Sequence, residues 1–185
     1  MKRLFLSIDL PETLAEEVAA VQDQLEDAGG LRFVDPAQAH VTLKFLGDVE
    51  ESRVSDVEAA VEAALDRVDV EAFDAAVADL GVFPSLEYIS VVWLGVRDGG
   101  EEMTRLHEAI ERETTAVGFD PEDHSFTPHV TIARMNDARG KELVQRVVGE
   151  AEPVVGSFRV SAVRLKESTL GDEGPVYDTL AEFAL

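Results

Sequence analysis

Two stretches of the chain share one pattern and decide its fold: AHVTLKFL at residues 39–46 and TPHVTIA at residues 127–133. Each is rich in β-branched and apolar residues, which is typical of a strand. Each contains the motif His-Val-Thr, and side chains alternate across a strand. In each motif the histidine and the threonine therefore project to one face and the valine to the other. We expect two strands that each present an imidazole and a hydroxyl together.

The elements around these strands recur in the same order. The first half predicts a strand over 3–9, a helix from Leu14 to Leu25, the strand 39–46, a second helix over 52–68 and an extended segment over 70–80. The second half predicts a strand over 89–96, a helix over 103–117, the strand 127–133, a helix over 137–148 and strands over 155–165 and 175–184. The central histidines differ by 129 − 40 = 89 positions and the helices after them by 137 − 52 = 85. This near-constant offset indicates a structural duplication.

The duplication predicts an α+β fold. We expect one domain over residues 1–185, built of two lobes that correspond to approximate halves 1–85 and 86–185. Each lobe would be an antiparallel sheet with outer helices, and a pseudo-two-fold axis would relate the two. An antiparallel sheet can leave one face uncovered. The two uncovered faces would then line a central cleft.

The composition is strongly acidic. The chain carries 38 acidic and 16 basic residues, for a formal charge of −22, yet 45% of it is hydrophobic. Disordered chains combine charge with few apolar residues, so a folded domain is expected. A solvated acidic shell suits a salt-rich cytoplasm, where salt screens the self-repulsion, and predicts a halophilic host. Such a surface excludes RNA binding by a broad basic face.

Other features of the composition limit the setting of the protein. With no cysteine there is neither a disulfide framework nor thiolate chemistry. No apolar run approaches the roughly 20 residues that span a bilayer. Asp9 and Pro11 cut the apolar stretch after Arg3 too short for a signal peptide. We expect a cytoplasmic monomer with no membrane partner.

The two motifs predict acid–base chemistry on a phosphodiester. Imidazole titrates near neutrality, so His40 and His129 can act as one acid and one base. The hydroxyls of Thr42 and Thr131 are short donors that suit the non-bridging oxygens of a phosphate. The scheme requires no metal and no cofactor. One such motif occurs easily by chance, whereas two on matching strands are far less expected.

Several neighbouring residues leave alternatives open. Lys44 has the parity of the first motif, so it reaches a phosphate or caps the strand end in solvent. Arg134 has the opposite parity and reaches the cleft only if the strand ends or twists there. His124 fits a surface turn and His107 a structural place beside the apolar stripe of its helix. Trp93 stacks on a nucleobase or packs in the core.

Further segments extend the pattern over nearly the whole chain. They are RLFLSIDLP (3–11), HVTLKFLG (40–47), FP (83–84), VWLGV (92–96), TPHVTIAR (127–134), LKES (165–168) and YDTLAEFAL (177–185). With these segments the chain resembles the RNA 2′,3′-cyclic phosphodiesterase family, also called 2′-5′ RNA ligases, within the two-histidine phosphoesterase superfamily. The resemblance implies a bilobal fold with both motifs facing one cleft.

The resemblance also implies a role for each motif residue. His40 would donate a proton to the departing 3′-oxygen and His129 would activate water, so that the product keeps a 2′-phosphate. Thr42 and Thr131 would hold the phosphate. The implied substrate is RNA with a 2′,3′-cyclic phosphate end, with tRNA halves among the candidates. Some members also run the reverse reaction in vitro and join RNA ends through a 2′-5′ linkage without ATP.

Three alternatives compete with this interpretation. One is a phosphoesterase that acts on a small cyclic nucleotide, such as a cyclic phosphate of ADP-ribose, or on a 2′-5′ oligonucleotide. Another is a nucleotide- or RNA-binding module without turnover, although binding alone does not need two titrating rings. The third is a metal hydrolase, which is disfavoured because no carboxylates stand at ligand spacing from the histidines.

Overall fold

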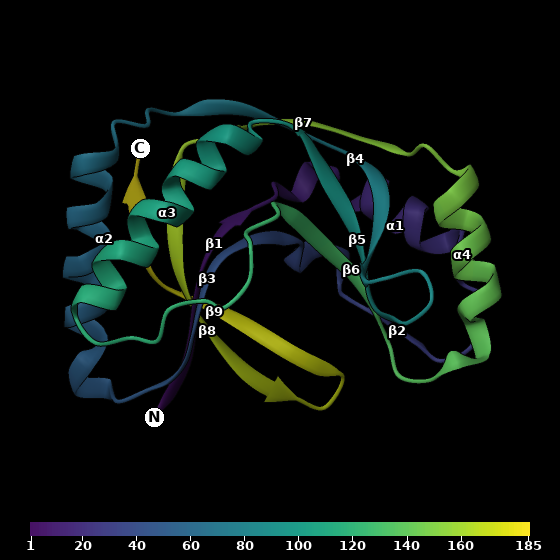
Figure 1. Ribbon diagram of the computed structural model, residues 1–185, viewed down its shortest axis with the longest axis horizontal. Helices are drawn as coiled ribbons and strands as arrows, with labels where there is room; N and C mark the ends of the chain where they lie inside the picture. Colours follow the sequence, from purple (N-terminus) through teal and green to yellow (C-terminus); the bar gives the residue numbers. More distant parts are fainter.

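The computed structural model describes residues 1–185 and has the predicted α+β architecture (Figure 1). The main elements are β1 (Lys2–Asp9), α1 (Ala15–Asp23), β2 (Leu31–Phe33), β3 (His40–Val49), α2 (Val54–Val68), β4 (Phe73–Pro84), β5 (Ile89–Asp98), α3 (Gly100–Ala116), β6 (His129–Met135), α4 (Lys141–Glu150), β7 (Val154–Val160), β8 (Ala162–Gly171) and β9 (Gly174–Ala184). All strand pairings are antiparallel.

The strands form two half-sheets that meet edge to edge. The order along the sheet is β7-β4-β5-β6-β3-β1-β8-β9, and β2 pairs with the end of β6. Across the junction between β3 and β6 a single residue pair, Val41 with Val130, is in register. The order is symmetric about this junction. Counted outward from it, β3, β1, β8 and β9 on one side correspond to β6, β5, β4 and β7 on the other. The junction is therefore where the pseudo-two-fold axis passes.

The two half-sheets do not follow the predicted sequence halves 1–85 and 86–185. Strands β8 and β9, from the end of the chain, pair with β1 and with each other, while β4, from the first half, pairs with β5 and β7. The reason is that β1 lies inside its half-sheet and needs a partner on each edge: β3 supplies one and β8 the other. The lobes are thus interleaved along the chain.

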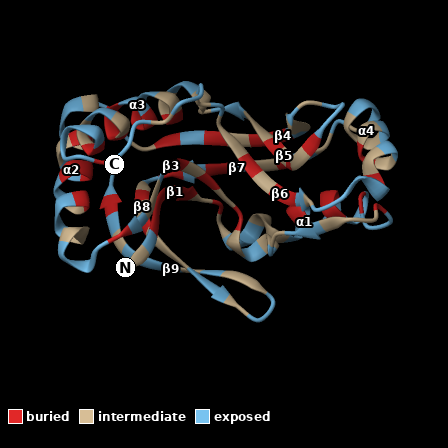
Figure 2. Cartoon of the chain, turned by 60° about the horizontal axis from the view of Figure 1, so that its bottom comes forward, coloured by how far each residue is buried: buried red, intermediate tan, exposed pale blue.

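Helices cover the outer faces of both half-sheets. Helices α2 and α3 pack together, α3 beside β3 and α2 beside β9, whereas α1 and α4 lie at the other end of the molecule (Figure 1). In α2 the residues Val57, Ala60, Val61 and Ala64 recur at helical spacing and are buried. Figure 2 shows the same division throughout, with buried residues along the strands and exposed residues on the outer helix faces. None of the helices is both long and apolar enough to cross a membrane.

Three local features differ from the sequence prediction. The expected strand over 155–165 is two strands, β7 and β8, divided at Ser161, because the chain passes there from one half-sheet to the other. The expected segment over 70–80 continues to Pro84. The three-residue strand β2 was not predicted, since so short a segment carries no periodic pattern.

Candidate active site

The two His-x-Thr motifs meet at the junction of the half-sheets. Val41 and Val130 face each other in the ladder and are both fully buried. Because side chains alternate, the histidines and threonines on either side of these valines project to the opposite, cleft face. Continued by one residue, the antiparallel register brings His40 toward Thr131, and Thr42 toward His129. All four line one cavity.

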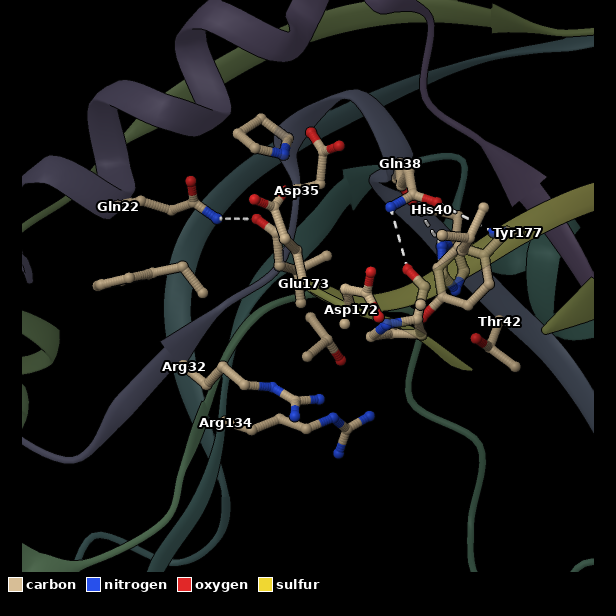
Figure 3. Close-up of a pocket in the computed structure, with 18 of the residues that line it drawn as sticks. Gln22, Arg32, Asp35, Gln38, His40, Thr42, Arg134, Asp172, Glu173 and Tyr177 are labelled. Atoms are coloured by element: carbon tan, nitrogen blue, oxygen red, sulfur yellow. Dashed lines mark hydrogen bonds between the residues drawn. The ribbon is translucent and has the colours of Figure 1, made fainter. Parts of the chain in front are cut away.

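This cavity has a volume of about 800 Å³ and is lined mostly by polar side chains. The linings come from the two motifs, from β2 with the turn that follows it, and from the tip of the β8–β9 hairpin. Figure 3 shows His40, Thr42, Gln38 and Tyr177 at one end and Arg32 and Arg134 at the other, with the acidic residues Asp172 and Glu173 between them. The cavity therefore has the imidazole of His40 and the hydroxyl of Thr42 at one end and two guanidinium groups at the other.

His40 is fixed by its backbone neighbour and by two aromatic rings. Its Nδ1 lies 2.8 Å from the carbonyl oxygen of Gln38. A carbonyl can only accept, so Nδ1 carries the proton and Nε2 is the nitrogen that is free to exchange one. The rings of Phe5 and Tyr177 pack on the imidazole at centroid distances of 5.1 and 5.2 Å. These contacts leave Nε2 as the reactive atom of His40.

His129 has the same arrangement in the second half-sheet. Its Nδ1 lies 2.6 Å from the carbonyl oxygen of Thr127, again two residues earlier. Phe83 and Trp93 pack on the ring at centroid distances of 4.9 and 6.0 Å. Both motifs therefore hold the same tautomer, with Nε2 available for proton transfer.

Burial lowers the pKa of both histidines below the ordinary value. For His40 the loss of hydration dominates, and the hydrogen bond to Gln38 and the carboxylate of Asp9 oppose it. For His129 burial again dominates, the bond to Thr127 opposes it, and the charges of Arg134 and His124 lower the pKa further. The neutral rings are thus favoured in the free protein. Nearby charges act in both directions on the pKa of His40, where Lys166 and His129 oppose Asp9, and only downward on the pKa of His129.

That difference follows from the strand beside each motif. Asp9 on β1 pairs with His40, whereas Gly95 on β5 pairs with His129, so only the first histidine faces a carboxylate across the ladder. Asp9 is held by Lys166 at 2.7 Å and by Arg164 at 3.1 Å. The pseudo-symmetry of the backbone is therefore broken by charge.

A β-bulge follows each motif and reverses the parity of the residues after it. Thr42 pairs with Ser7 but Lys44 pairs with Leu6, so Leu43 is the extra residue on β3. Lys44 consequently turns away from the cleft and is fully buried against Glu111, so neither the phosphate contact nor the solvent cap is correct.

The matching bulge on β6 turns Arg134 toward the cleft, whereas the bulge on β3 turns Lys44 away from it. Thr131 pairs with Trp93 but Ala133 pairs with Val92, so Ile132 is the extra residue. Arg134 therefore returns to the cleft face and lines the cavity. Its neighbour across the ladder is Arg32 of β2, which lines the cavity too.

The other candidates lie as follows. The side chain of His124 is 72% exposed and contacts Asp123, so it is a surface residue. His107 is buried in α3 and bonds the carbonyl oxygen of Leu43. Trp93 packs on Phe83 and borders His129, and its Nε1 has no hydrogen-bond partner.

Sequence reasoning missed two groups of the cavity wall. Arg32 sits on the short strand β2, for which no pattern exists in the sequence. Gln38 joins the hairpin to the turn before His40, because its amide donates to the carbonyl of Pro175 and accepts from the N–H of Tyr177. Tyr177 itself lies in one of the segments that carry the family resemblance, and that segment was the only signal for it.

Comparison with known proteins gives consistent matches over nearly the full length. A family profile described as the 2′-5′ RNA ligase superfamily matches residues 10–172. A Methanothermobacter thermautotrophicus protein named RNA 2′,3′-cyclic phosphodiesterase is 39% identical, with 99% of this chain and 98% of the relative covered. A protein of the same name from Aeropyrum pernix is 37% identical over 89% of this chain and 93% of its own.

Two solved structures share the fold. The Thermus thermophilus protein TT0787 superposes with a TM-score of 0.79 at 28% identity, covering 99% of this chain and 97% of its own. Escherichia coli LigT, in a complex with 3′-AMP, has a TM-score of 0.79 at 26% identity, covering 100% of this chain and 98% of its own.

Proposed function

The chain belongs to the 2′-5′ RNA ligase superfamily, and on that premise we propose that it hydrolyses RNA 2′,3′-cyclic phosphodiester ends to 2′-phosphomonoesters. The observation that carries the proposal is the Val41–Val130 pair, which puts both His-x-Thr motifs on the wall of one cavity. A single phosphorus between them would meet two imidazoles and two hydroxyls. The curated relatives that bear the name of this activity support the choice of substrate.

In the proposed reaction His129 acts as the base and His40 as the acid. Nε2 of His129 takes a proton from water, whose oxygen forms a new bond to phosphorus. The bond from phosphorus to the 3′-oxygen breaks, and Nε2 of His40 gives its proton to that oxygen. The product carries a 2′-phosphate and a free 3′-hydroxyl. Thr42 and Thr131 would donate to the non-bridging oxygens as charge develops there.

The charges beside the two rings support these roles. A general acid must start protonated, and the carboxylate of Asp9 favours the charged form of His40, whereas Lys166 and His129 oppose it. A general base must start neutral, and Arg134 and His124 favour the neutral form of His129. Burial lowers both pKa values, and Asp9 is the one charge among these neighbours that favours a protonated ring, which supports His40 as the acid. The same groups would serve 2′-5′ ligation if the 5′-hydroxyl of a second RNA end replaced water: His129 would take its proton, its oxygen would bond to phosphorus, and His40 would protonate the departing 3′-oxygen.

RNA would be held locally, by the arginines at the far end of the cavity. Most guanidiniums of this protein are bound to carboxylates, as Arg97 is to Asp79 and Arg139 to Asp137. Arg32 and Arg134 instead lie side by side on paired strands and extend into the cavity (Figure 3). Two adjacent cations without carboxylate partners suit the phosphates or bases of a bound strand.

The test is product analysis on a defined RNA. The protein is incubated in concentrated KCl with an oligonucleotide that ends in a 2′,3′-cyclic phosphate, and the hydroxyl that keeps the phosphate is identified. A 2′-phosphate product, lost in both His40→Ala and His129→Ala and retained in a strong chelator, supports the metal-independent scheme. A 3′-phosphate product would overturn the roles of the two histidines, and chelator sensitivity would overturn metal independence.

Substrate choice is tested in the same assay. A cyclic mononucleotide and a 2′-5′ dinucleotide are run beside the oligonucleotide at matched concentrations. The proposal requires the RNA end to have the highest kcat/KM. Preference for either small substrate would replace it with the small-nucleotide alternative, and binding of all three without turnover would replace it with the binding module.

A further inference from the structure

The sheet alone holds the two catalytic motifs together at a single point. Only Val41 and Val130 are paired across the junction of β3 and β6. Acid–base catalysis is sensitive to distance, and a displacement of about 1 Å can lower a rate by about 100-fold. Another set of contacts must therefore fix the position of one motif relative to the other.

Helix α3 is hydrogen-bonded to the strand of the first motif at Leu43 and Lys44, the two residues that follow Thr42. The ring of His107 donates from Nδ1 to the carbonyl oxygen of Leu43, the bulged residue, at 2.7 Å. Glu111 accepts a hydrogen bond from Nζ of Lys44 at 2.5 Å. His107 and Glu111 are four residues apart and so lie on the same face of the helix.

The same face of α3 also holds the segment that leads into the second motif, residues 117–128. Phe126 stacks on His107 with a centroid distance of 4.2 Å and an interplanar angle of 9°. Glu111 accepts from the backbone N–H of Glu122 at 2.7 Å. Lys44 donates a further hydrogen bond to the carbonyl oxygen of Asp120, also at 2.7 Å.

The burial of Lys44 shows how much depends on these bonds. Its side chain is completely buried, so its ammonium group has given up all hydration. A buried charge is tolerated only when it is paired and hydrogen-bonded. Glu111 and the carbonyl of Asp120 provide both, and they tie β3, α3 and the segment 117–128 into one unit.

We propose that His107, Glu111, Lys44 and Phe126 form a clamp that sets the position of His129 relative to His40. The segment that the clamp holds includes Thr127, directly after Phe126, and the carbonyl of Thr127 fixes the Nδ1 proton of His129. Phe126 is thus a positioning residue for the base. The inference rests on the proposed function for its kinetic consequence, but not for its structural one.

The experiment uses Phe126→Ala in the full chain, with Phe126→Tyr as the conservative variant and Val144→Ala as the control. Val144 is fully buried in α4, away from the clamp, so its truncation costs stability without touching the motifs. Steady-state kinetics on the cyclic-phosphate oligonucleotide are measured together with NMR titrations of both histidine rings.

Phe126→Ala should lower kcat by about 10- to 100-fold with little change in KM, since the substrate contacts remain and the base is displaced. The titration of His129 should shift while that of His40 stays in place. Phe126→Tyr should restore kcat and the His129 titration. Val144→Ala should lower Tm and leave both titrations unchanged.

A second variant tests whether the four residues act as one network. Lys44→Met added to Phe126→Ala should lower kcat little further than the more damaging of the two single changes, because both release the same segment. Additive losses would overturn a common clamp. So would a folded Phe126→Ala protein with unchanged kcat and an unchanged His129 titration. If the wild-type protein lacks phosphodiesterase activity, the proposed function fails, while the titrations still decide the clamp.

Discussion

The histidine of each His-x-Thr motif is bound through Nδ1 to the carbonyl two residues before it, and at the residue scale this contact leaves Nε2 for proton transfer. Because the tautomer is the same in both motifs, the two rings differ only through their surroundings. The carboxylate of Asp9 faces His40, and no carboxylate faces His129 across the ladder. We therefore expect changes at Asp9 to act on one limb of the pH profile.

Asp9→Asn should shift the alkaline limb of the kcat/KM profile to lower pH. The carboxylate raises the pKa of His40, so its removal lowers that pKa further, and Lys166 and Arg164 then add uncompensated positive charge. The acid is lost as pH rises through its pKa, so the loss begins earlier. The acidic limb, which reports the neutralisation of His129, should stay in place. A shift of the acidic limb alone would reverse the roles of the two histidines.

Thr42→Val should lower kcat/KM by a factor that corresponds to about 1–3 kcal/mol, because one donor to a phosphate oxygen is lost. Valine keeps the shape of threonine, and Thr42 is on the cleft face, so folding should be little affected. Thr131→Val is the symmetric comparison. Kinetics that match the wild type in both variants would leave the threonines without a part in phosphate binding.

At the scale of elements, the packing of β4 against β5 supports the ring of His129. A Cβ added to Gly81 would lie 2.2 Å from the ring of Trp93, which borders His129. Gly81→Ala must therefore displace Trp93. We expect a loss of about 1–3 kcal/mol in the free energy of unfolding together with a lower kcat.

Gly149→Ala is the matched control for that change. Gly149 lies in α4 with no atom near the position of an added Cβ, so alanine should stabilise the helix by about 0.5–1 kcal/mol. Chemical denaturation and kinetics are measured on both variants. Unchanged activity in a folded Gly81→Ala protein would mean that Trp93 does not support the position of His129.

The sequence allowed the existence of most elements and the face of each motif to be predicted, because period-2 and period-3.6 patterns are local. The bulges at Leu43 and Ile132 could not be predicted, since an inserted residue looks like any other strand residue. Parity counted past these residues is therefore wrong, which misplaced Lys44 and left the side of Arg134 undecided.

The order of the strands in the sheet could not be predicted from local sequence patterns either, because it depends on pairing between distant residues. Which strand fills the second edge of β1 depends on contacts between residues more than 150 positions apart, as between Leu4 and Glu167. The short strand β2 is also defined only by its partner β6. Arg32 owes its place in the cavity to that long-range pairing, so of the two arginines at the cationic end only Arg134 could be a candidate from sequence.

At the scale of the whole molecule, the charge of −22 should make stability depend on salt. The self-repulsion of the acidic surface is screened over about 10 Å at 0.1 M salt and about 3 Å at 1 M. We expect Tm to rise steadily as KCl is increased from 0.1 to several molar. Sucrose serves as the control, because it favours the compact state without screening charge. Full stability and activity without added salt would contradict the halophilic interpretation.

RNA affinity should respond to the same salt only weakly, because two local arginines rather than a broad basic surface would hold the strand. If Arg32 and Arg134 make two phosphate contacts, the slope of log K against log[salt] should be about −1.4, from about −0.7 per contact with a single strand. A broad basic surface would give a slope several times steeper.

The slope is measured by fluorescence anisotropy with His129→Ala and a labelled cyclic-phosphate oligonucleotide. Arg32→Gln and Arg134→Gln in that background should each flatten the slope by about half, whereas Arg146→Gln on α4, outside the cavity, should leave it unchanged. A slope that neither cavity variant alters would mean that the strand is held elsewhere on the surface.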